Sequence, residues 1–171
     1  WDVSNVEDMS VMFSDTANFN GNISDWDVSS VTIMTAMFSD AASFNGAIGN
    51  WDVSNVENMD YMFAGVDGSV FNQDISSWDT GKVIDMEGMF GFAAAFNQDL
   101  GAWDISSVIN LTAMFYNATT FDQDLGAWDI SSATNMDGMF EGATSFNQPL
   151  NFQGMERTPT MVNMLKGATS F

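Results

Sequence analysis

Apolar residues return along this chain in a fixed register. Tryptophan recurs every 25 residues, with one interval of 27, at Trp1, Trp26, Trp51, Trp78, Trp103 and Trp128. After each tryptophan come, in the same order, a valine or isoleucine, a methionine (leucine at Leu111), a Met-Phe pair, a single phenylalanine and an isoleucine or leucine. Self-similarity at such a period is the signature of a repeat architecture, so the sequence predicts about seven tandem copies.

Two copies depart from the pattern. The third is two residues longer, and its extra length falls in Gly65–Val70, which we expect to form a loop. The seventh starts at Gln153 instead of a tryptophan and contains Pro159, although its later apolar residues keep the register. We predict a single repeat domain over residues 1–171. Because Trp1 already stands inside a copy, we expect the chain to be part of a longer protein.

Two periodicities coexist within a copy. In Leu100–Ile105 the apolar residues have the spacing of a strand, and in Val108–Phe115 they recur at the intervals of three and four that are typical of a helix. Ser4 and Glu7 form a capping-box pattern, and Gly142 is typical of a helix end. The sequence therefore predicts an α/β solenoid, a leucine-rich-repeat-like stack of about seven strand-helix repeats with a parallel sheet and a continuous core.

The repeat also resembles a known family. Leu100, Trp103 and Ile105 take the apolar places of the LxxLxL skeleton of a leucine-rich repeat. The fuller pattern, FNQDL, then WD(V/I)SS, then M..MF, resembles the BspA-like leucine-rich-repeat surface proteins, in a Trp- and Met-rich subgroup classed as a domain of unknown function. The resemblance covers nearly the whole chain. It implies a cell-surface protein that adheres to host or matrix components, and it supplies no catalytic residues.

Charge excludes several classes of function. Acidic residues number 23, against only Lys82, Arg157 and Lys166, and the net charge is −20. Such a charge repels nucleic acids and anionic lipid, and no apolar run is long enough to insert into a membrane. The chain contains no cysteine and no histidine, which excludes disulfides, thiolate metal sites and imidazole bases.

The candidate site is a row of acids that directly follow the tryptophans. Its members are Asp2, Asp27, Asp52, Asp79, Asp104 and Asp129. Stacking would align them on the outer face at ~4.8 Å spacing, where like charges repel. Either hydrogen bonds from nearby serines, or the capping of the following helix, or Ca²⁺ bound between copies would offset the repulsion. The candidates for a ligand face are Asp27, Asp52, Asp79, Asp104, Asp129, Ser29, Ser54 and Ser106, and those for Ca²⁺ are Asp27, Asp52, Asp79 and Asp104.

Two other rows have structural and functional interpretations. A partial row of acids occurs at Asp74, Asp99 and Asp124, preceded by asparagines at Asn20, Asn45, Asn72, Asn97 and Asn147. We expect these asparagines to bond the backbone of the adjacent copy. The tryptophans could stack against sugars on the surface, but their places in the LxxLxL skeleton favour burial.

These features favour a non-catalytic adhesion or ligand-binding module of a bacterial-type cell-surface or secreted protein. We expect an extracellular or cell-surface location, a monomeric domain, and as partner a host, matrix or neighbouring-cell protein or glycan. One alternative is a passive structural spacer in a large adhesin. A remote one is a glycoside-acting enzyme that uses aligned aspartates. Such a catalytic pair needs opposite pKa shifts, whereas each aspartate here has near-identical copies, so we predict no enzyme activity.

Overall fold

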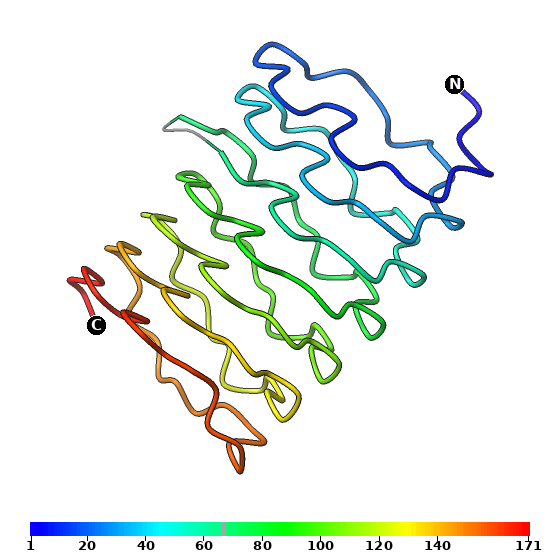
Figure 1. Cartoon of the computed structure of the whole chain (residues 1–171). Helices are drawn as coiled ribbons and strands as arrows, with labels where there is room; N and C mark the ends of the chain where they lie inside the picture. The colour runs from blue at the N-terminus through cyan, green and yellow to red at the C-terminus, as the bar shows by residue number, and fades with distance from the viewer. Residues whose placement is uncertain (66–67) are drawn as a thin grey trace.

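Each copy of the repeat forms one coil of a stack in the computed structural model, which describes residues 1–65 and 68–171 (Figure 1). Coils 1 to 7 begin at Trp1, Trp26, Trp51, Trp78, Trp103, Trp128 and Gln153. The coils lie side by side in chain order, and the two termini lie at opposite ends of the stack. The loop expected at Gly65–Val70 falls partly on residues 66 and 67, which lie outside the described residues.

Backbone hydrogen bonds join each coil to the next, and in this set the amides belong to the earlier coil and the carbonyls to the later one. In coil 5, amides of alternate residues from Leu111 to Asn117 donate to carbonyls of Asn135 to Glu141 in coil 6, at 2.8–2.9 Å. The same four bonds run from every coil to its successor. Isolated parallel bridges also link one residue of each coil: Asp8, Ile33, Asn58, Asp85, Asn110, Asn135 and Thr160. These bonds hold the stack together without any extended strand in the described residues.

The predicted helix is absent from the described residues because each copy contains a left-handed residue in its middle. The tenth residue after the start of each coil has a φ of 52–62°, whereas an α-helix needs about −63°. These residues are Val11, Ala36, Tyr61, Gly88, Ala113, Gly138 and Asn163. The apolar spacing of three comes instead from consecutive turns, such as the one closed by the Met114 amide and the Leu111 carbonyl at 3.3 Å.

The predicted strand is replaced by turns as well. The Trp103 amide donates to the Leu100 carbonyl at 3.1 Å, and the Val108 amide donates to the Ile105 carbonyl at 2.9 Å. The prediction of an α/β, leucine-rich-repeat-like solenoid with strand-helix repeats and a parallel sheet is therefore wrong. Residues 1–65 and 68–171 contain no helix and no strand beyond isolated bridges. No membrane-spanning helix occurs among them either.

Stacked aromatic rings form the core. One phenylalanine ladder has ring centroids 5.5–5.7 Å apart and runs through Phe13, Phe38, Phe63, Phe90, Phe115 and Phe140. A second ladder, at 5.8–6.3 Å, runs through Phe19, Phe44, Phe71, Phe96, Phe121, Phe146 and Phe171. Within coils 1 to 6 the two rings stack at 4.0–4.1 Å. Offset stacking of this kind adds to the energy of burial.

Burial of the tryptophans is confirmed within the stack. Trp51, Trp78, Trp103 and Trp128 are buried, Trp26 is partly buried against the core, and Trp1 is 88% exposed. Each buried indole N–H donates to the backbone carbonyl three residues before the preceding tryptophan. Trp78, for example, donates to the Ile48 carbonyl at 3.1 Å. A buried indole N–H needs such a partner, so the tryptophans both fill the core and join neighbouring coils.

Candidate functional site

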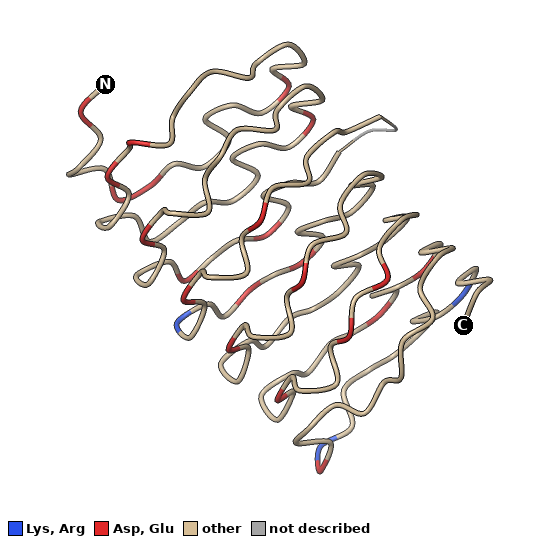
Figure 2. Cartoon of the chain, turned by 180° about the vertical axis from the view of Figure 1, so that it is seen from behind, with Lys and Arg blue, Asp and Glu red and all other residues tan. Residues whose placement is uncertain are grey.

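The aspartates that follow the tryptophans lie at an exposed corner of each coil, and Figure 2 shows acidic residues recurring along the stack. Each one closes a turn by accepting the amide of the residue two positions later. Asp52 Oδ1 accepts the amide and the hydroxyl of Ser54 at 3.1 and 2.6 Å. The pairs Asp2–Ser4, Asp27–Ser29 and Asp104–Ser106 do the same, and Asp79 and Asp129 accept only the amides of Gly81 and Ser131. The predicted bonding of serine to aspartate is therefore confirmed, and the capping-box interpretation of Ser4 is wrong.

These hydrogen bonds favour the ionised form of three corner aspartates. The Ser29, Ser54 and Ser106 hydroxyls and amides lower the pKa of Asp27, Asp52 and Asp104 below the usual value. Partial burial opposes this shift, and for Asp27 the neighbouring carboxylates oppose it too. For these three aspartates the hydrogen bonds have the larger effect on the pKa, so their charge does not require a bound cation.

The same turn explains why the acids are 18 aspartates and only five glutamates. Two more corners of the coil use it, with Asp8, Asn58, Asp85, Asn110 and Asn135 at one, and Asn22, Asp74, Asp99 and Asp124 at the other. An aspartate or asparagine side chain has the length to reach the amide two residues on. The preference for aspartate therefore has a structural cause, and it carries no information about cation binding.

The proposed Ca²⁺ site was based on Asp27, Asp52, Asp79 and Asp104. In the part of the chain that the structure describes, no three acidic side chains gather closely enough to hold an ion. Asp79 and Asp104 do approach one another, since a Cβ on Gly81 would lie 3.5 Å from one carboxylate and 3.3 Å from the other. A weaker site built from two carboxylates stays a prediction.

The asparagine row has the structural role that was expected. The amide of Asn45 donates to Asn20 Oδ1, and Asn72 and Asn97 repeat this bond on the preceding coil, all at 3.0 Å. Asp122 takes the place of asparagine in coil 5 and accepts from Asn147. Gln98, Gln123 and Gln148 add side-chain bonds to the same atoms. This face of the stack is therefore fully used in joining coils.

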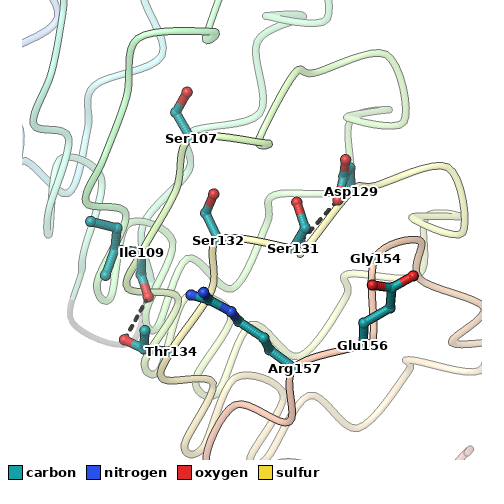
Figure 3. A pocket seen from close by; sticks show the side chains of 9 residues that line it. All are labelled: Ser107, Ile109, Asp129, Ser131, Ser132, Thr134, Gly154, Glu156 and Arg157. Carbon is teal, nitrogen blue, oxygen red and sulfur yellow. Dashed lines mark hydrogen bonds between the residues drawn. The ribbon is translucent and has the colours of Figure 1, made fainter.

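An open depression of about 910 Å³ lies where coil 7 departs from the repeat (Figure 3). Its lining comes from three coils: Ser107, Ile109, Asp129, Ser131, Ser132, Thr134, Gly154, Glu156 and Arg157. Gly154 is left-handed, and a Cβ there would collide with Asp129 and Ser131. Arg157 extends across the depression toward Ser132. Hydroxyl groups and charges of both signs around open space suit weak contacts with a polar ligand, and they include the ligand-face candidate Asp129.

A second, apolar pocket of about 170 Å³ interrupts the regular surface of coils 3 to 5. Its walls are Tyr61, Phe92 and Tyr116, and its floor consists of Ala64, Gly88, Gly91 and Ala113. The walls include both tyrosines of the chain. Sequence reasoning missed this pocket because it followed the residues that repeat. The sequence does contain a signal for this pocket, which is the departure from the repeat: large aromatic residues stand here where the other copies carry mostly small or polar ones.

Contacts between neighbouring coils hold the three rings of the pocket. The Tyr61 ring lies over Gly88 of the next coil, where a Cβ would come within 2.5 Å of the ring, and its hydroxyl donates to Glu87. The rings of Phe92 and Tyr116 meet edge to face, with centroids 5.2 Å apart. Each of the three rings therefore has a partner within the protein.

Comparison with known proteins identifies one family. The family described as "Mycoplasma protein of unknown function, DUF285" matches residues 1–90 and 66–171. No curated protein and no solved structure matches the chain. The two matched segments overlap and together include every copy of the repeat. The chain therefore belongs to the DUF285 family of Mycoplasma proteins of unknown function.

Proposed function

We propose that this chain is a non-catalytic binding module of an extracellular or cell-surface protein. The stack of coils is its rigid scaffold, and the pocket of Tyr61, Phe92 and Tyr116 is its ligand-binding site. The partner is a host, matrix or neighbouring-cell protein or glycan. The single observation that carries the proposal is that large, exposed aromatic rings gather at this pocket, where the other copies carry mostly small or polar residues.

The aromatic residues of the pocket bring no gain in backbone geometry. Tyr61 and Phe92 have φ values of 54° and 59°, in the left-handed region that favours glycine. A non-glycine residue there costs about 1–2 kcal/mol. Gly138 occupies the Tyr61 position in coil 6, and Gly142 occupies the Phe92 position. Val11 and Ala36 have similar φ values outside the pocket, so this cost belongs to the turn itself, and what distinguishes Tyr61 and Phe92 is the size of their exposed rings.

Exposure and family resemblance support the same function. Tyr61 and Phe92 remain 39% and 38% exposed, so their rings stabilise the core little. An exposed apolar pocket on a strongly charged surface is typical of a ligand site. The resemblance to BspA-like surface proteins supports a surface location and a role in adhesion.

The proposal is tested by binding of the purified chain to a panel of matrix glycoproteins and glycans. We expect at least one ligand whose binding is lost in a Tyr61→Gly/Phe92→Gly double variant. Val11→Gly is the matched control, because Val11 is also left-handed but belongs to coil 1, outside the pocket. Binding unaffected by the double variant would place the ligand site elsewhere on the stack, and no binding at all would favour the passive spacer. Turnover of a glycan would instead show that the chain is a glycoside-acting enzyme.

A further inference from the structure

The aromatic pocket has the chemistry of a site for a quaternary ammonium ion. We propose that Tyr61, Phe92 and Tyr116 enclose a trimethylammonium group, such as that of choline, an inference that rests on the proposed binding function. A cation above aromatic faces is attracted by the negative charge of the π-systems. Three aromatic rings line this one pocket, so a cation bound there would lie close to each of them.

Negative charge surrounds the pocket. Burial, the bond to Glu87 and the nearby carboxylates of Glu87, Asp60 and Asp85 raise the pKa of Tyr61 to about 12. Lys166 lies near Tyr116, and its charge is paired with Glu141 at 2.7 Å. The net charge of −20 adds a field of the same sign. The site therefore attracts cations and repels phosphates and carboxylates.

The absence of polar groups in the lining selects among cations. Besides the tyrosine hydroxyls, the described side chains that line the pocket carry no hydrogen-bonding atom, and the Tyr61 hydroxyl already donates to Glu87. A primary ammonium would lose hydrogen bonds to water without replacing them. A trimethylammonium makes no hydrogen bonds in water, so entry into an apolar pocket costs it less. Its methyl groups can also pack against the rings and the glycine floor.

The test compares choline with its neutral isostere, 3,3-dimethyl-1-butanol, by NMR titration of the purified chain. We expect choline to bind about tenfold more tightly, which corresponds to a cation–π contribution of roughly 1.4 kcal/mol. Phosphocholine should bind more weakly than choline because its phosphate is repelled. Phe92→Gly should abolish the difference between choline and the isostere, and Val11→Gly should leave it unchanged.

Four outcomes would overturn the inference in different ways. Equal affinity for choline and the isostere would show an apolar pocket with no preference for charge. Phosphocholine bound as tightly as choline would contradict the role of the surrounding carboxylates. If choline does not bind while a panel ligand still depends on Tyr61 and Phe92, the cation inference is wrong and the proposed binding function stands. If no ligand depends on these residues, both are wrong.

Discussion

Two turns recur in every coil, and they differ in how strictly their residues repeat. The corner after the tryptophan keeps aspartate in all six coils that begin with tryptophan, and this aspartate always accepts the amide two residues later. The left-handed turn keeps its φ in all seven coils but carries valine, alanine, tyrosine, glycine or asparagine. Where a side chain makes the turn, the fold dictates the residue. Where the backbone makes it, the side chain is free to acquire a function.

The repeating residues should dominate stability, and Trp78→Ala gives the largest expected effect. Trp78 is buried and donates its indole N–H to Ile48 of the previous coil. Removal of the ring should lower the free energy of unfolding by about 3–5 kcal/mol in urea denaturation. Trp1→Ala, at an 88% exposed position, should change it little. Similar effects for the two variants would contradict the claim that the buried, repeating residues dominate stability.

Glycine substitutions test the left-handed turn next. Gly138→Ala meets no close atom, so it should cost only the backbone strain of φ 62°, about 1 kcal/mol. Gly88→Ala adds a Cβ within 2.5 Å of the Tyr61 ring and should cost clearly more. Thermal unfolding of both variants measures the difference. Equal losses would show that the Tyr61 ring is not held over Gly88.

The repeat number, the register, the buried rows and the asparagine bonds could be predicted from the sequence, but the helix and the strand could not. Apolar spacing of three is the same for a helix and for consecutive turns. The signal that separates them is the glycine at positions 88 and 138, in the middle of the expected helix. The capping-box pattern of Ser4 and Glu7 is ambiguous in the same way, because Ser4 donates to Asp2 and does not cap a helix. The aromatic pocket requires the arrangement of three coils, which no single copy contains.

A corner aspartate should have a smaller effect than a core residue. Asp52→Ala removes both bonds from Ser54 and should cost about 1 kcal/mol, whereas Asp52→Asn keeps an oxygen in place and should cost less. Denaturant unfolding at pH 7 measures both. A loss of several kcal/mol would mean that the corner also supports the core.

The same corner gives stability a pH dependence. The folded pKa of Asp27, Asp52 and Asp104 lies below the unfolded value of about 3.9. The unfolded chain therefore binds more protons as pH falls, and the contribution of these groups is full above about pH 5. It is lost as pH drops through the folded pKa. Asp52→Asn should reduce the fall in thermal midpoint between pH 5 and pH 3, and an unchanged fall would contradict the assignment.

The specific effect of Ca²⁺ on the thermal midpoint should be the smallest. Its measurement distinguishes an acidic face that is only solvated from one that binds a metal ion. The described carboxylates form no group of three, and each corner aspartate is already stabilised by its own turn. We therefore expect CaCl₂ and NaCl at matched ionic strength to raise the thermal midpoint equally relative to chelator, because both screen a net charge of −20. A larger shift with Ca²⁺ would indicate a site between coils 4 and 5, where Asp79 and Asp104 both approach Gly81. Loss of that extra shift in an Asp79→Asn/Asp104→Asn variant, with Asp2→Asn as control, would then assign the ion to this pair and show that the corner row also binds cations.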